Sequence, residues 1–196
     1  MPSRAKPARR RQRQSGLGRY LTADRLVIGG ALLLTVVFIA LVLIDGLSRQ
    51  PPSLNLDNIP DNSVAYPVQG QDHVQPGDGH PAYNSNPPTS GWHYPQDAPL
   101  GVYTDPLADE TLVHNLEHGH IWLSYRDADG QDALNLLREI QSRYPQHVIV
   151  TARPQNDSRI AAAAWGRLLT LEELDADQLY AFVLRHRNRA PENIPG

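Results

Sequence analysis

Residues 104–125, TDPLADETLVHNLEHGHIWLSY, predict a helix that ends at a glycine and leads into a buried strand. The segment Thr104-Asp105-Pro106 is typical of a helix start, because a capping side chain precedes a proline in the first turn. Gly119 is a typical helix stop. We therefore expect a helix over 106–118, followed by a strand over 120–125.

The segments that follow predict the rest of one small domain. Residues 132–144 have the periodicity of an amphipathic helix, and residues 147–152 form an apolar run typical of a buried strand. We expect a further strand over 160–169 and a final helix over 175–188. This succession of helices and strands predicts an α+β fold, built as a small α/β sandwich over residues 63–190. The pairing of the strands does not follow from the sequence.

Upstream of the domain, residues 26–44 form 19 uncharged and mostly apolar positions. At about 1.5 Å per residue a helix of this length matches the hydrocarbon thickness of a bilayer. We expect one transmembrane helix here, followed by a linker over 45–62. A cleaved signal peptide is the alternative, although its apolar core is usually shorter and no small-residue cleavage pattern follows.

The charges of the chain divide sharply at this apolar stretch. Eight of the 18 basic residues precede residue 26, whereas 20 of the 21 acidic residues follow it. The positive-inside rule then predicts a basic cytoplasmic arm over 1–25 and an extracytoplasmic domain, ending in a short tail over 191–196. The acidic domain argues against binding of nucleic acid, and the arm is better suited to setting topology and contacting anionic lipid.

Four of the eight histidines lie in two short blocks, PPTSGWHY at 87–94 and VHNLEHGH at 113–120. Histidine is the side chain most often used to bind metals or to transfer protons near neutral pH. On the predicted helix His114 and His118 lie on one face, one turn apart, so both rings can reach one ion. The string His114-x-x-Glu117-His118 also matches the reversed zinc-protease pattern, in which the glutamate activates a zinc-bound water.

The chain resembles a widespread bacterial family of proteins of unknown function, the domain numbered 3105. The resemblance extends over about 62–188 and is carried by YNSNPPTSGWHY at 83–94, by VHNLEHG at 113–119 and by His73-Val74 before them. The family implies small exported or membrane-anchored proteins, without an activity that can be transferred. It also implies that five residues occupy motif positions: His73, His93, His114, Glu117 and His118.

From these residues we expect a metal site formed by His93, His114 and His118, with His73 as a fourth ligand. The chain has no cysteine and its one methionine is Met1, so nitrogen and oxygen ligands remain, which favours copper(II) or zinc. We expect Glu117 to orient an imidazole from outside the ligand shell.

Three other interpretations stay open. The first is a zinc-dependent hydrolase with Glu117 as general base, and the second is proton transfer by the histidines without a metal. The third is a non-catalytic interaction module at the membrane, in which the histidines only hold the proline-rich loop against the core. A nucleophilic Ser90 activated by His93 is disfavoured, because no strained turn surrounds the serine.

Overall fold

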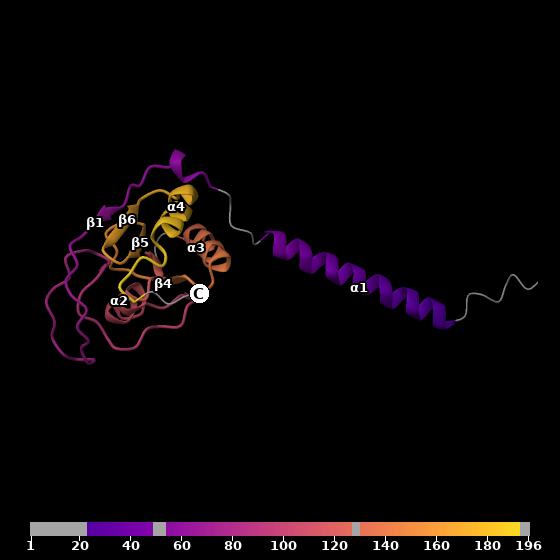
Figure 1. Cartoon of the computed structure of the whole chain (residues 1–196), viewed down its shortest axis with the longest axis horizontal. Coiled ribbons are helices and arrows are strands. Elements are labelled where there is room, and N and C mark those ends of the chain that lie inside the picture. Colours follow the sequence, from indigo (N-terminus) through magenta and orange to yellow (C-terminus); the bar gives the residue numbers. More distant parts are fainter. Residues whose placement is uncertain (1–22, 49–53, 127–129, 193–196) are drawn as a thin grey trace, which may run out of the picture. The chain divides into compact units, whose positions relative to one another are not determined.

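The computed structural model describes residues 23–48, 54–126 and 130–192, and the chain forms two compact units, residues 1–48 and 49–196. In the first unit, helix α1 spans Ala23–Ser48 and is helical throughout the predicted apolar segment (Figure 1). Among the helices of the described residues, none combines the length and apolarity needed to cross a membrane. Residues 1–22 of the predicted arm and 193–196 of the predicted tail lie outside the described residues.

The second unit is a mixed α+β domain around a six-stranded sheet, as the sequence predicts. The strand order is β1-β6-β5-β3-β4-β2. The strands are β1 (Val64–Ala65), β2 (Val102–Tyr103), β3 (Ile121–Tyr125), β4 (Val148–Ala152), β5 (Ile160–Ala164) and β6 (Arg167–Leu171). Strands β3, β4 and β2 run parallel to one another, whereas β5 pairs antiparallel with both β3 and β6. Helix α3 (Gln131–Arg143) connects the parallel strands β3 and β4, which need a crossover of this kind.

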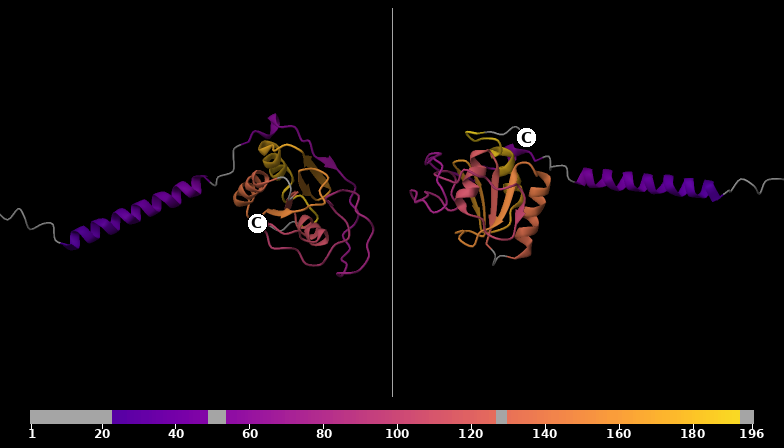
Figure 2. Two further views of the ribbon diagram at one scale, coloured as in Figure 1. Left: turned by 180° about the vertical axis from the view of Figure 1, so that it is seen from behind. Right: turned by 90° about the horizontal axis from the view of Figure 1, so that it is seen from below.

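Helices cover both faces of the sheet, so that every residue of the central strands β3, β4 and β5 is buried. On one face, alternate residues of β3 such as Leu123 pack with α3 and α4 (Ala176–His186). On the other face Trp122 packs with Leu112 and Leu116 of α2 (Asp109–Glu117). Figures 1 and 2 show α2 and the long loop before it on the side opposite α3 and α4.

Two predicted elements are corrected. Residues 160–169 are not one strand, because Trp165 and Gly166 form a tight turn that separates β5 from β6. Helix α2 begins at Asp109 rather than at 106, and its N-cap residue is Ala108, whose side chain makes no capping hydrogen bond. The first turn is instead held by Arg153, whose Nε and Nη2 donate to the two carboxylate oxygens of Asp109 at 2.9 and 2.7 Å.

The domain also includes part of the segment expected to be a linker. Arg185 of α4 donates through Nη2 to the carbonyl oxygen of Leu56 at 2.7 Å, and Gln178 donates through Nε2 to that of Pro60 at 3.3 Å. His186 lies 3.6 Å from the carboxylate of Asp61. The segment 56–61 is therefore packed along the last helix.

Candidate metal centre

The centre begins where two distant parts of the long loop meet. His73 and His93 form a parallel β-bridge, in which the Val74 amide donates to the His93 carbonyl at 2.8 Å and the His93 amide donates to the Asp72 carbonyl at 3.1 Å. Residues opposite one another in a bridge project to the same side. The two loop histidines therefore form one pair of rings, with centroids 4.9 Å apart.

Helix α2 presents the second set of side chains. His114 and Glu117 lie three residues apart on one face and both are buried. The helix ends at Glu117, and Gly119 follows with a φ of +84°, in the left-handed region that glycine adopts at helix ends. This confirms the predicted end of the helix. The last turn of α2, which carries His114 and Glu117, faces the loop histidines.

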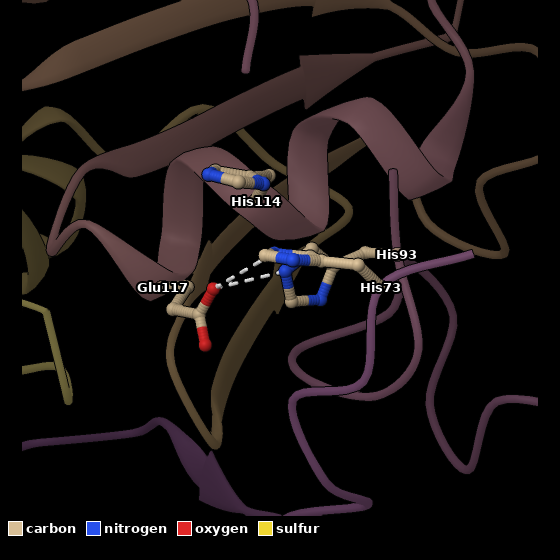
Figure 3. Close-up of side chains that lie close together, drawn as sticks. All are labelled: His73, His93, His114 and Glu117. Carbon is tan, nitrogen blue, oxygen red and sulfur yellow. Dashed lines mark hydrogen bonds and ion pairs between the residues drawn. The ribbon is translucent and has the colours of Figure 1, made fainter. Parts of the chain in front are cut away.

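Three histidines and one carboxylate converge at this point (Figure 3). Each of His73, His93, His114 and Glu117 offers one nitrogen or oxygen atom, and these atoms all lie within 4.8 Å of one another. The Nε2 of His93 lies 2.9 Å from Oε2 of Glu117, and the Nε2 of His73 lies 3.9 Å from the same oxygen. His93 is fully buried, whereas the side chain of His73 is 46% exposed and gives the centre its contact with solvent.

Backbone carbonyl groups fix the orientation of two of the rings. His93 donates through Nδ1 to the carbonyl oxygen of Gly91 at 2.7 Å, and His114 donates through Nδ1 to that of Tyr94 at 2.7 Å. A carbonyl only accepts, so Nδ1 carries the proton in both rings, and in the neutral form Nε2 is left as a lone pair. The Nε2 of His93 lies next to the carboxylate of Glu117, and the Nε2 of His114 lies on the side of His118.

Burial lowers the pKa of His93, although its contacts with the Gly91 carbonyl and the Glu117 carboxylate oppose this shift. The neutral ring is the form that binds a metal. A bare Nε2 and a carboxylate oxygen at 2.9 Å would direct lone pairs at each other. The geometry therefore requires a shared proton or a cation between them.

His118 lies beside this group rather than in it. Its Nε2 is 3.1 Å from the Nε2 of His114, while its Nδ1 is 3.5 Å from Oδ2 of Asp97. It belongs to a second convergent group with Asp97 and His120. The structure thus brings together three of the four predicted ligands, His73, His93 and His114. Glu117 lies in the same group, and the fourth predicted ligand, His118, lies next to it.

The sequence pattern did not single out Asp97 or His120. His120 follows Gly119 two residues after His118, and this spacing is the one signal that was available; Asp97 lies in a proline-rich loop with no signal of its own. Burial lowers the pKa of His120, and the neighbouring His118 adds to the effect. Both residues are positioned by Asn115, whose Oδ1 accepts from the Ala98 amide at 3.0 Å and whose backbone carbonyl accepts from the His120 amide at 3.1 Å.

The contacts of Ser90 do not support a serine nucleophile. Its hydroxyl oxygen accepts from the Gln69 amide at 3.1 Å. Both ring nitrogens of His93 are engaged elsewhere, Nδ1 with the Gly91 carbonyl and Nε2 with Glu117. His93 is therefore not placed to act as a base for this serine.

A sequence model of the family described as "Protein of unknown function (DUF3105)" matches residues 73–195. This range contains both convergent groups. No curated protein and no solved structure matches the chain.

Proposed function

The chain belongs to the DUF3105 family, and we propose that its domain binds a divalent transition-metal ion, zinc or copper(II), where the loop histidines meet the end of α2. The proposed ligands are His73, His93, His114 and Glu117. Glu117, expected from the sequence to act outside the ligand shell, is proposed as a direct ligand because its Oε2 lies among the ring nitrogens.

The fixed orientation of the two buried rings is the observation that carries the proposal. Histidines that bind metals almost always donate their second ring N–H to a carbonyl or carboxylate, which fixes the tautomer and aims the other nitrogen at the ion. His93 and His114 both make this contact, each at 2.7 Å and each with a backbone carbonyl of the same loop. A cation between His93 and Glu117 also relieves the opposed lone pairs.

The chemistry of the donors supports zinc or copper(II). Three imidazoles and one carboxylate suit either ion, and the chain has no cysteine to favour softer metals. Glu117 supplies one negative charge against the charge of the ion. The ion would enter from the side of His73, the one ligand of the four with substantial exposure.

Metal analysis of the purified full-length protein tests the proposal. After loading with zinc or copper(II) and removal of free ion, the His114→Gln variant is expected to retain one equivalent less metal than the wild type. His147→Gln is the matched control, because His147 lies outside both convergent groups. Equal metal content in wild type and His114→Gln would contradict the proposal.

Glu117 distinguishes a binding site from the zinc-dependent hydrolase. The hydrolase needs Glu117 to face a metal-bound water, whereas here its Oε2 contacts His93 directly. If Glu117 is a ligand, the Glu117→Gln variant is expected to bind the ion more weakly. Retained metal with loss of a measurable hydrolytic activity in this variant would instead favour the enzyme.

Although no described helix meets the length and apolarity needed to cross a membrane, we also propose, from the uncharged run over 26–44 in the full sequence, that these residues hold the domain outside the cytoplasm. Large apolar side chains along this part of α1, such as Leu34 and Phe38, are exposed and need an apolar environment, which a bilayer would supply. The basic residues before them favour a cytoplasmic N-terminus. Resistance of the full-length protein to carbonate extraction, with protease access to the domain only from outside, is the expected result; release into the soluble fraction would contradict it.

A further inference from the structure

We propose that Asp97, His118 and His120 bind a second divalent transition-metal ion next to the first. The proposal extends the proposed function to a two-ion centre. Its ligands are not shared with the first group, and the two sites can be tested separately.

The spacing of the three side chains is that of ligands around one ion. Each offers one ligand atom, and the three atoms lie within 4.8 Å of one another. The Nδ1 of His118 lies 3.5 Å from Oδ2 of Asp97, too far for a good hydrogen bond. Two ligands bound to a tetrahedral zinc at the usual distances are about 3.4 Å apart. The pair therefore has the separation that a shared ion would impose.

Unpartnered buried atoms give an independent reason to expect a ligand here. Among the described residues, three buried side-chain polar atoms have no hydrogen-bond partner: His118 Nδ1, His120 Nδ1 and the Tyr144 hydroxyl. Two of the three belong to this group. Buried polar atoms without partners are rare and costly in native proteins, and an ion is one way to satisfy them.

The hydrogen bonds of the first group determine which nitrogen of His118 is free. Because His114 donates its Nδ1 proton to the Tyr94 carbonyl, its Nε2 accepts the 3.1 Å hydrogen bond from Nε2 of His118. In the neutral ring the proton of His118 is then on Nε2, and its Nδ1 is a lone pair on the side of Asp97. This is the nitrogen needed for a second ion.

His118 also connects the two ions. An ion in the first site would take the lone pair of His114 that accepts from His118. The freed Nε2–H lies 3.6 Å from Oε2 of Glu192, an exposed carboxylate that would have to move closer to accept it. The amide of Glu192 already donates to the carbonyl of Glu117 at 3.1 Å, which keeps this acidic residue at the end of α2. Variants of His118 therefore affect both sites, and the test uses Asp97 and His120 instead.

The test counts zinc ions bound to the full-length protein. The wild type is expected to bind two equivalents by isothermal titration and by metal analysis after gel filtration. Asp97→Asn and His120→Gln are each expected to bind one, and combining either with His114→Gln is expected to leave none. Asp97→Asn is a mild change at a side chain that is 41% exposed, and a circular dichroism spectrum like that of the wild type verifies its fold.

The outcomes separate this inference from the proposed function. One equivalent in the wild type that persists in both Asp97→Asn and His120→Gln overturns the second site and leaves the first in place. One equivalent that persists in His114→Gln and is lost in His120→Gln overturns the first site and supports the second. Absence of bound zinc in the wild type overturns both.

Discussion

Gly91 combines a backbone requirement with a role in the metal centre. Its φ is +122°, a conformation that residues with a Cβ rarely adopt, and an added Cβ would lie 3.0 Å from the ring of Tyr83. Its carbonyl oxygen holds Nδ1 of His93 at 2.7 Å. The orientation of the buried His93 imidazole thus depends on the backbone conformation of Gly91.

We therefore expect Gly91→Ala to lower both stability and metal affinity. Backbone strain together with the contact with Tyr83 should cost about 1–3 kcal/mol in the free energy of unfolding, measured with urea. Gly77→Ala is the matched control, since Gly77 also has a positive φ but an added Cβ would meet nothing within 4 Å. Equal metal affinity in the Gly91 and Gly77 variants would show that the Gly91 carbonyl does not position His93.

Outside the metal centre, His186 is expected to make the stability of the domain depend on pH. Burial lowers its pKa, with Arg167 and Arg189 adding to the shift and Asp61 opposing it. The unfolded chain then binds a proton near pH 6.5 that the folded chain does not, so stability should fall as the pH decreases below about 6.5. Urea unfolding in EDTA at pH 7.5 and 5.5 should show a smaller loss for His186→Gln than for wild type; an equal loss would exclude His186 as a contributor.

At the scale of elements, Asn115 joins α2 to the loop that carries Asp97. Its Oδ1 accepts from the Ala98 amide at 3.0 Å and its Nδ2 donates to the Ala98 carbonyl at 2.8 Å, both in a fully buried position. The two hydrogen bonds satisfy both the backbone N–H and the backbone carbonyl of Ala98, which lies outside the strands. The distance between His118 and Asp97 is set by this contact.

Asn115→Ala should accordingly destabilise the domain by about 2–3 kcal/mol, because it removes two hydrogen bonds and leaves the buried Ala98 groups without partners. It should also weaken binding of the second ion more than binding of the first. The control is Asn135→Ala on the exposed side of α3, where the side-chain oxygen accepts from Arg138 at 3.3 Å. A loss no larger than that of the control would contradict the proposed role of Asn115.

Elements with a long apolar pattern could be predicted from the sequence, and short ones could not. Strands β3 and β4 have five buried residues each and were predicted within about a residue of their bounds. β1 and β2 have two residues each, too few for a periodicity, and their positions follow from pairing with β6 and β4. The hairpin of β5 and β6 was not predicted, because within 160–169 only Gly166 and Arg167 interrupt the apolar run.

The same distinction applies to the centre. The helix spacing placed His114, Glu117 and His118 at the end of α2, and the motif resemblance pointed to His73 and His93. The division of these residues into two groups could not be predicted, because it depends on which ring nitrogens of His93 and His114 donate to backbone carbonyl groups. Asp97 joins through the long-range contact of Asn115 with Ala98, which leaves no local pattern in the sequence.

At the scale of the whole domain, the proposed ions would join the long loop to the body of the fold. His73 and His93 lie in the loop, whereas His114 and Glu117 lie on α2, which packs on the sheet through Leu112 and Leu116. The described residues contain one isolated β-bridge, and it joins His73 to His93 within the loop. A metal ion bound by residues of both the loop and α2 would therefore hold the loop in place, where regular secondary structure does not.

Removal of metal should consequently destabilise the domain and open the loop first. At a free ion concentration a hundredfold above Kd, binding at one site adds about 2.7 kcal/mol to the free energy of unfolding. EDTA should lower the Tm of the zinc-loaded wild type, and amide exchange should rise at Val74 and His93, whose N–H groups form the bridge, before it rises in β3. The His114→Gln/His120→Gln variant should not respond to EDTA. An unchanged Tm in the wild type would favour the non-catalytic interaction module, in which the histidines hold the loop through their hydrogen bonds alone.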